Sequence, residues 1–168
     1  MLIVAREYVP SKPEMSVHVA STRRNSSSPL LAVKSLNYLE NIVARREAER
    51  LGHDESVFLN ESGYLAEGCS TNIFWAKNGS LFTPELSCGL LPGITREALI
   101  SVAKKLGMKV KEGRFKLASM LGSQGAFLTN SLIGITPVSW VDDVKLASDE
   151  KIFIRLRDSL DKKLGWRA

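Results

Sequence analysis

Hydrophobic and polar positions alternate along this chain with two periods, one typical of strands and the other typical of helices. Period two predicts strands over 2–9, 16–22, 56–60, 64–67, 72–77, 80–83, 108–115, 125–130 and 136–141. A period near 3.6 predicts helices over 35–51, from Thr95 to a stop at Gly107, near 117–121 and near 149–164. Asn78-Gly79 between two strands is a favoured hairpin turn. Because hairpins outnumber βαβ units, the pattern favours a mixed α/β (α+β) fold over a parallel Rossmann sheet.

Length and composition narrow the class of protein. The chain has 168 residues, of which 44% are hydrophobic and 24% are charged, enough for one large domain with its own core. No apolar run is long enough to span a membrane, and the first residues lack a signal-peptide pattern. Only Cys69 and Cys88 are present, in no metal-ligand spacing, which argues against a disulfide framework and predicts no metal site. We expect a cytoplasmic protein without a membrane partner.

The net charge of +5 is compatible with nucleic acid or with an anionic small molecule. Pairs such as Arg45-Arg46, Lys104-Lys105 and Lys162-Lys163 are spread along helix faces and form no basic stripe with aromatic residues. We therefore expect a small-molecule substrate with amino or carboxylate groups, and no nucleic acid.

Lys34 is the candidate catalytic residue. It follows the apolar run 30–33 and precedes the helix predicted over 35–51, so we expect its stem to be buried. Burial lowers the pKa of a lysine and leaves the free amine that covalent catalysis needs. The alternative is an ordinary surface lysine.

An acid and two anion-binding turns accompany this amine. Glu67 lies between apolar and small residues at a strand end, as a buried acid or a turn carboxylate. Gly93-Ile94-Thr95 opens a helix, either as an anion site or as a plain Thr N-cap. Asn130-Ser131 follows a strand and would hold the same anion or form an Asx or Ser turn. Pyridoxal phosphate (PLP) needs an amine, an acid for its ring nitrogen and sites for its phosphate.

Other polar residues have weaker patterns. Arg23 and Arg24 would bind a substrate carboxylate or lie in a solvated loop. Tyr38 would contact the cofactor's phenolic oxygen or pack in the core. His18 and His53 are isolated in the sequence and have no evident partner.

Four runs together resemble the fold-type IV PLP enzymes, the class IV aminotransferase family. They are Lys34-Ser-Leu-Asn-Tyr-Leu, Glu67-Gly-Cys-Ser-Thr-Asn-Ile-Phe, Leu91-Pro-Gly-Ile-Thr-Arg, and Thr129-Asn-Ser-Leu followed by Ile135-Thr-Pro-Val. The resemblance implies the larger, cofactor-binding domain of the D-amino-acid aminotransferase-like fold, with a barrel-like β core and flanking helices.

The resemblance also implies a role for each matching residue. Lys34 would be the Schiff-base lysine and proton shuttle, and Glu67 would pair with the pyridine nitrogen. Leu91 would pack on the ring, and Tyr38 would face the cofactor. Ile94, Thr95 and Ser131 would hold the phosphate. We expect Gly93 and Asn130 as further cofactor-binding residues, and Arg23, Arg24 and Asn130 as candidate substrate contacts.

Within the family, two features resemble aminodeoxychorismate lyases more than aminotransferases. Asn-Ser-Leu at 130–132 and a glycine at 134 stand where aminotransferases carry a small residue, Thr and an acid. Arg-Arg-Asn and a Ser/Pro-rich loop also precede Lys34. The implied reaction releases pyruvate from 4-amino-4-deoxychorismate and leaves 4-aminobenzoate for folate synthesis. The alternatives are a branched-chain or D-amino-acid aminotransferase, and a cofactor domain that does not turn over.

The same resemblance implies a domain organisation and an oligomeric state. Family members carry a smaller amino-terminal domain, and we expect residues 1–168 to be the PLP-binding carboxyl-terminal domain without it, as a fragment or a naturally short gene product. Family members are usually homodimers, so a homodimer is expected by resemblance.

Overall fold

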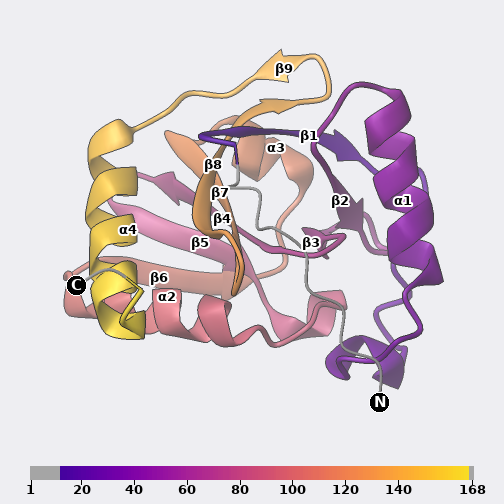
Figure 1. Cartoon of the computed structure of the whole chain (residues 1–168), viewed down its shortest axis with the longest axis horizontal. Helices are drawn as coiled ribbons and strands as arrows, with labels where there is room; N and C mark the ends of the chain where they lie inside the picture. Colours follow the sequence, from indigo (N-terminus) through magenta and orange to yellow (C-terminus); the bar gives the residue numbers. More distant parts are fainter. Residues whose placement is uncertain (1–11, 167–168) are drawn as a thin grey trace.

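The computed structural model describes residues 12–166 and places one mixed sheet at the centre of the molecule (Figure 1). The strands are β1 (Met15–Val19), β2 (Glu55–Leu59), β3 (Leu65–Gly68), β4 (Asn72–Lys77), β5 (Ser80–Pro84), β6 (Lys109–Gly113), β7 (Gly125–Asn130), β8 (Gly134–Val141) and β9 (Val144–Lys145). The α-helices are α1 (Leu39–Arg50), α2 (Ile94–Lys105), α3 (Leu117–Leu121) and α4 (Glu150–Leu164), and two 3-10 helices are η1 (Pro29–Ala32) and η2 (Leu86–Cys88).

Strand order shows why the fold is not a Rossmann sheet. The order is β3-β2-β1-β8-β7-β4-β5-β6, with β9 paired to β8. β1 is parallel to β2 and β8, and β5 is parallel to β6, whereas the other neighbours are antiparallel. The predicted mixed α/β class is confirmed.

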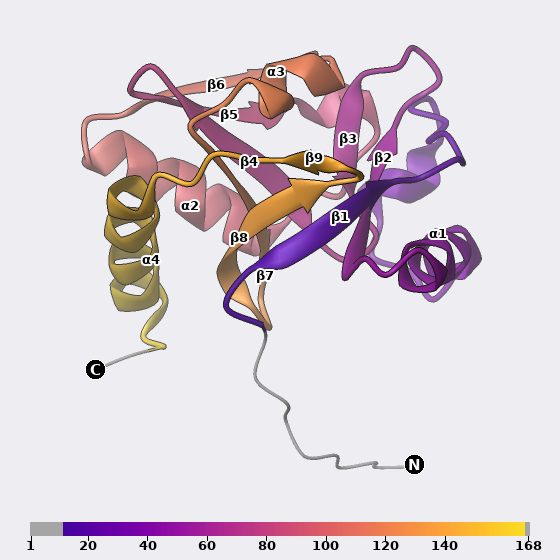
Figure 2. The ribbon, with the colours of Figure 1, turned by 90° about the horizontal axis from the view of Figure 1, so that it is seen from above.

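The sheet curls into a half-barrel (Figure 2). The N–H of Leu65 in β3 donates to the carbonyl of Phe115, just past β6, over 2.8 Å, so the two ends of the strand order lie close together. Along β4, Ile73 and Trp75 point into the core within the curl, and Phe74 and Ala76 belong to the core outside it. This period-two alternation of side chains gives one sheet two packed faces.

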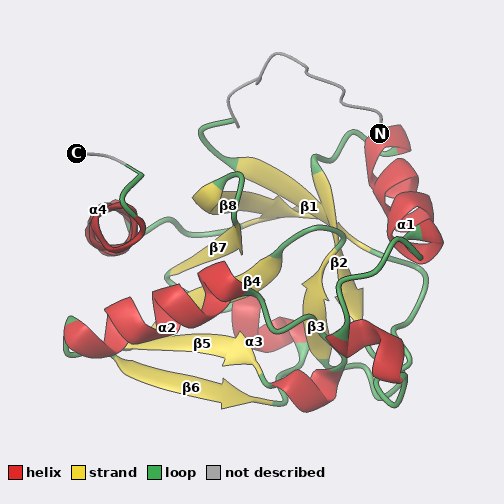
Figure 3. Cartoon of the chain, turned by 60° about the horizontal axis from the view of Figure 1, so that its bottom comes forward, coloured by secondary structure: helices red, strands yellow, loops and turns green. Residues whose placement is uncertain are grey.

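Helices cover the outside of the curl. α2 and α4 pack together on the face formed by Phe74, Leu81 and Phe127, and α2 runs beside β5 (Figure 3). α1 lies against β2, where the Ser56 hydroxyl donates to the Ala44 carbonyl over 2.7 Å. None of the helices within residues 12–166 has the length and apolarity needed to cross a membrane.

Most predicted elements are present, and the Asn78-Gly79 hairpin turn is confirmed. Its two residues have φ of 49° and 69°, and Lys77 pairs with Ser80. These are the positive angles that a type I′ turn requires. The sequence did not predict β9 or the two 3-10 helices, all of which are short. The strand predicted over 2–9 lies outside the described residues.

Two predicted boundaries are wrong. The helix predicted over 35–51 begins at Leu39, because local turns occupy the residues before it. There the Ser35 hydroxyl accepts the Asn37 N–H over 3.3 Å, and the Tyr38 N–H donates to Leu36 over 2.9 Å. The strand predicted over 16–22 ends at Val19. Beyond it the Ser21 N–H donates to the Glu47 carboxylate over 3.2 Å instead of extending the strand.

Candidate functional site

Four separate segments meet around one cavity of about 640 Å³. They are the loop between β1 and α1 with the start of α1, the end of β3 with the turn after it, the entry to α2, and the end of β7. Every residue predicted for catalysis, cofactor or substrate lines this cavity: Arg23, Arg24, Lys34, Tyr38, Glu67, Leu91, Gly93, Ile94, Thr95, Asn130 and Ser131. Their convergence is a property of the fold, since they span more than a hundred positions of the sequence; their chemical roles stay predictions.

Glu67 is a buried acid at this cavity. Only 7% of the residue is exposed, and Oε2 accepts the Leu91 N–H over 2.9 Å. Burial raises the pKa of Glu67 from its ordinary 4.5 to about 7, although the Leu91 N–H and the Arg24 charge act in the opposite direction. Such a carboxyl can hold or release a proton near neutral pH and would be stabilised as an anion by a cationic ring nitrogen.

Arg24 is the partner of this acid. Its guanidinium lies 3.4 Å from Oε1 of Glu67, binds Glu40 and donates to Oδ1 of Asn41 over 3.1 Å. The same group stacks 3.8 Å above the ring of Phe58. Because Arg24 is only 2% exposed, the solvated-loop interpretation is wrong for this residue, whereas Arg23 is exposed. Arg24 therefore holds several groups of the cavity wall together.

Lys34 lies at the cavity but in a different setting from the one expected. It is exposed, as are the flanking Ala32 and Val33, so the prediction that the apolar run buries its stem is wrong. The reason is that η1 turns this run along the surface, and the loop then continues for six residues, 33–38, before α1 begins. The Nζ atom lies 5.7 Å from the centre of the Tyr38 ring.

Tyr38 is the N-cap residue of α1 and faces the same acid. Burial and then the nearby Glu67 carboxylate raise the pKa of Tyr38 above its ordinary 10.0, so the phenol is a hydrogen-bond donor at neutral pH. This arrangement is compatible with the predicted contact to a cofactor oxygen.

The entry to α2 lines one end of the cavity and is the candidate anion-binding position. The N-cap of α2 is Gly93, which corrects the interpretation of Thr95 as the N-cap. A Cβ at Gly93 would lie 2.2 Å from Oδ1 of Asn72, so any residue other than glycine would clash with Asn72 at this position. The backbone N–H groups of the first turn and the helix dipole favour a negative group at this position.

Asn130 keeps the other wall in place. Its Oδ1 accepts the N–H groups of Leu132 and Ile133 over 2.8 and 2.9 Å, and its Nδ2 donates to the Ser70 carbonyl over 3.1 Å. This is the Asx turn that the sequence left as an alternative, and it makes the Asn130 side chain a structural element of the cavity rim. Ser131 next to it is exposed and remains a candidate phosphate ligand.

Sequence analysis missed four buried polar residues that line the cavity. Asn41 donates to the Cys69 carbonyl over 2.5 Å, and Asn72 donates to the Leu91 carbonyl over 3.0 Å. The hydroxyls of Thr71 and Thr129 are buried and have no hydrogen-bond partner among the described residues. The two asparagines lie inside or beside the quoted runs, but only a tertiary contact shows what they bind.

These features fit PLP. The unpaired hydroxyls of Thr71 and Thr129, and the side-chain-free entry at Gly93, leave room and polar groups for a small anionic molecule. Glu67 supplies an acid, and Lys34 supplies an amine at the same cavity.

Comparisons with known proteins agree with this geometry. The family model described as amino-transferase class IV matches residues 1–141. The chain belongs to the class IV aminotransferase family. This family is PLP-dependent, and the curled sheet with flanking helices is its fold.

Relatives include proteins of two activities. Aminodeoxychorismate lyase of Bacillus subtilis is 38% identical over 130 residues, covering 77% of this chain and 44% of the relative. The solved structure of a putative 4-amino-4-deoxychorismate lyase from Legionella pneumophila is 33% identical, with a TM-score of 0.90, covering 94% and 59%. A branched-chain amino acid aminotransferase from Thermobaculum terrenum, solved in its PLP form, is 30% identical, with a TM-score of 0.86, covering 92% and 52%. The chain thus spans about half the length of these relatives.

Proposed function

We propose that this chain binds PLP through Lys34, and that the whole protein is an aminodeoxychorismate lyase that converts 4-amino-4-deoxychorismate to 4-aminobenzoate and pyruvate. The observation that carries the proposal is the meeting of Lys34, Glu67 and the start of α2 at one cavity. PLP, when bound, supplies an electron sink for the bonds at the substrate's Cα.

Each residue then has a defined task. Lys34 would hold the cofactor's aldehyde carbon and move the substrate's Cα proton with its Nζ. Glu67 would keep the ring nitrogen protonated, and Arg24 with the Leu91 N–H would hold Glu67 in position. The N–H groups at Ile94 and Thr95, together with Ser131, would bind the phosphate.

One observation supports lyase over aminotransferase. It is the run Asn130-Ser131-Leu132-Ile133-Gly134, which lacks the acid before the Ile135-Thr-Pro-Val stretch. The identities of the relatives do not separate the two activities, because lyase and branched-chain aminotransferase relatives are both 38% identical to this chain. A branched-chain or D-amino-acid aminotransferase is the second candidate, because the aminotransferase from Thermobaculum terrenum has nearly the same identity and TM-score as the lyase structure.

The first experiment tests the cofactor. The pure chain is incubated with PLP, reduced with borohydride and digested, and the modified peptide is identified by mass. We expect label on Lys34, and no specific label in Lys34→Ala. Lys77→Ala, which removes a lysine of β4 that does not line the cavity, serves as the matched control. Label spread over many lysines in the unaltered chain would contradict the proposal.

The second experiment separates the activities. Release of 4-aminobenzoate and pyruvate without any added keto acid supports a lyase. Transfer that requires 2-oxoglutarate or another keto acid supports an aminotransferase. A chain that is labelled on Lys34 but turns over neither substrate is a cofactor domain that needs further protein for activity.

The resemblance further implies self-association, and we propose a homodimer in the cytoplasm. Support comes from the apolar side chains of Val33, Leu36 and Leu39 beside Lys34, which are 59%, 103% and 69% exposed. Both cysteines are free and buried, which suits a reducing compartment. Sedimentation of the chain with and without PLP tests the dimer, and a monomer under both conditions would contradict it.

A further inference from the structure

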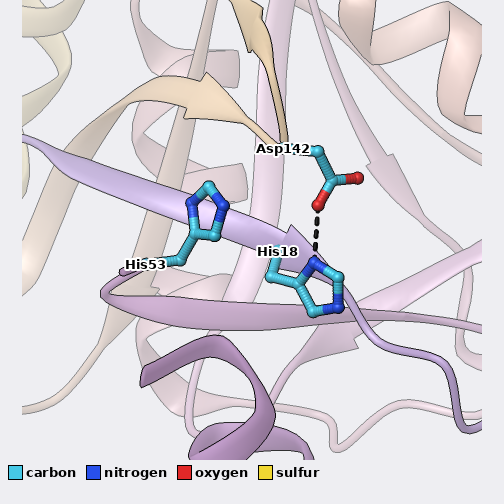
Figure 4. Close-up of side chains that lie close together, drawn as sticks. All are labelled: His18, His53 and Asp142. Atoms are coloured by element: carbon cyan, nitrogen blue, oxygen red, sulfur yellow. Dashed lines mark hydrogen bonds and ion pairs between the residues drawn. The ribbon is translucent and has the colours of Figure 1, made fainter. Parts of the chain in front are cut away.

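His18, His53 and Asp142 meet on the molecule outside the cavity (Figure 4). His18 lies in β1, His53 follows the end of α1, and Asp142 occupies the turn between β8 and β9. One nitrogen of each imidazole and one carboxylate oxygen lie within 4.8 Å of one another. The sequence interpretation of His18 and His53 as isolated residues is therefore wrong, because β1 pairs with both β2 and β8 and brings the three segments together.

Backbone hydrogen bonds hold each of the three positions. The Asp142 N–H donates to the Val17 carbonyl over 2.8 Å, and the His53 N–H donates to the Ala48 carbonyl over 2.9 Å. His18 is in register with Ser56 across the β1–β2 ladder. The three side chains are thus presented by a rigid frame, which is what a preorganised ligand site requires.

The side chains themselves form an unusual group. Nδ1 of His18 lies 2.6 Å from Oδ1 of Asp142, and the two imidazoles stack with centroids 5.9 Å apart. Nε2 of His18 faces Oε1 of Glu47 at 3.7 Å. Two carboxylates therefore flank two imidazoles, and this combination of charges attracts a cation.

His53 gives a second, independent indication. Its Nδ1 atom is buried and has no hydrogen-bond partner among residues 12–166. A buried ring nitrogen without a partner costs free energy, and a metal ion or a proton donor would remove that cost. Nothing in the cavity chemistry described above uses this nitrogen.

We propose that His18, His53 and Asp142 bind one divalent transition-metal ion of the zinc type. Imidazole nitrogen and carboxylate oxygen are ligands that such ions prefer, at about 2.0–2.2 Å. Ligand atoms around a tetrahedral ion are then about 3.3 Å apart. The His18–Asp142 pair must therefore open from 2.6 Å, and any pair near the 4.8 Å limit of the group must close. The Asp142 side chain is 41% exposed and can make that movement by a small rotation, although its Oδ1 also accepts the Val19 N–H over 3.1 Å.

Glu47 completes the arrangement. With the ion bound at Nδ1 of His18, the opposite Nε2–H would point to the Glu47 carboxylate. A carboxylate that orients a metal-bound histidine in this way is a recurrent feature of metal sites. The ion would tie β1, the end of α1 and the β8–β9 turn together, so its expected effect is on stability.

The test uses tag-free chain without free PLP, titrated with Zn²⁺ alone and, separately, with Co²⁺ alone. We expect one equivalent of Zn²⁺ bound per chain and visible Co²⁺ absorption bands of a low-coordinate nitrogen and oxygen site. At about 100 times the dissociation constant, the melting temperature should rise by about 5–10 °C.

Two variants and a matched control decide the outcome. His53→Gln and Asp142→Asn should weaken binding by at least about tenfold and remove the Co²⁺ bands. Asp143→Asn changes the neighbouring exposed carboxylate of the same turn and should bind as the unaltered chain does. Near-UV circular dichroism confirms that each variant is folded, and His18→Gln replaces any that is not. No saturable binding up to about 1 mM, or equal binding by His53→Gln and Asp142→Asn, would overturn the proposal.

Discussion

The carboxylate of Glu67 accepts the backbone N–H of Leu91 over 2.9 Å, which joins the end of β3 to the loop that leads into α2. This bond links the candidate acid of the site to the candidate anion-binding position at the start of α2. Arg24 holds the other oxygen of the same carboxylate at 3.4 Å. Both carboxylate oxygens of Glu67 therefore have a partner, and the burial of this group has a consequence that can be measured.

That consequence is a free energy of unfolding that depends on pH. Folding raises the pKa of Glu67 from 4.5 to about 7, so between these values the folded chain binds more protons than the unfolded chain. The resulting stability is complete below pH 4.5 and is lost as the pH rises through about 7. The free energy of unfolding should change by about 3 kcal/mol in total, because each tenfold change in proton affinity contributes about 1.36 kcal/mol.

Glu67→Gln should therefore flatten the dependence of the unfolding free energy on pH between about 4.5 and 7, measured by urea titration of the cofactor-free chain. Glu97→Gln, in the exposed first turn of α2, should leave the slope unchanged. The same slope in Glu67→Gln as in the unaltered chain would show that another group titrates.

Arg24→Met should destabilise the chain far more than Arg23→Met. Arg24 is 2% exposed and binds Glu67, Glu40 and Asn41, so its loss leaves buried polar groups without a partner. We expect a loss of about 3 kcal/mol, against about 0.5 kcal/mol or less for the exposed Arg23. Urea unfolding of the two variants measures the difference, and equal losses would contradict the structural role of Arg24.

Gly93→Ala should impair PLP binding. The new Cβ would lie 2.2 Å from Oδ1 of Asn72, which would displace the entry to α2. We expect affinity for PLP to fall by about tenfold or more, since about 1.4 kcal/mol of lost binding suffices. Gly122→Ala is the matched control, because the nearest atom to its Cβ in the described part of the chain is Nζ of Lys77, at 3.4 Å. Absorbance titration with PLP measures both, and unchanged affinity in Gly93→Ala would remove this residue from the site.

Gly79→Ala tests the hairpin turn apart from any side-chain clash. Gly79 has φ of 69°, and a Cβ there would meet no atom of residues 12–166 within 4 Å. The cost is therefore the backbone strain of a left-handed residue, about 1 kcal/mol. Thermal or urea unfolding measures it, with PLP binding expected to stay unchanged. A much larger loss would mean that the turn bears contacts that the structure does not show.

The elements that depend only on neighbouring residues could be predicted from the sequence. The 117–121 helix, the 125–130 strand and the Asn78-Gly79 turn follow from hydrophobic period and turn preference, and the structure has them at the predicted positions. The runs around Lys34, Glu67, Leu91 and Asn130 indicated the family, because together they have the residue types that PLP requires.

Burial and contacts between distant segments were decided only by the tertiary structure. The sequence predicted a buried Lys34 stem and placed Arg24 either at a substrate carboxylate or in a solvated loop. In the structure Lys34 is exposed and Arg24 is buried, because η1 carries the lysine loop outward while Phe58 and Glu67 cover the arginine. His18, His53 and Asp142 meet only because β1 lies between β2 and β8. Period and propensity act over a few neighbouring residues, whereas the order of strands in a sheet brings together residues a hundred positions apart.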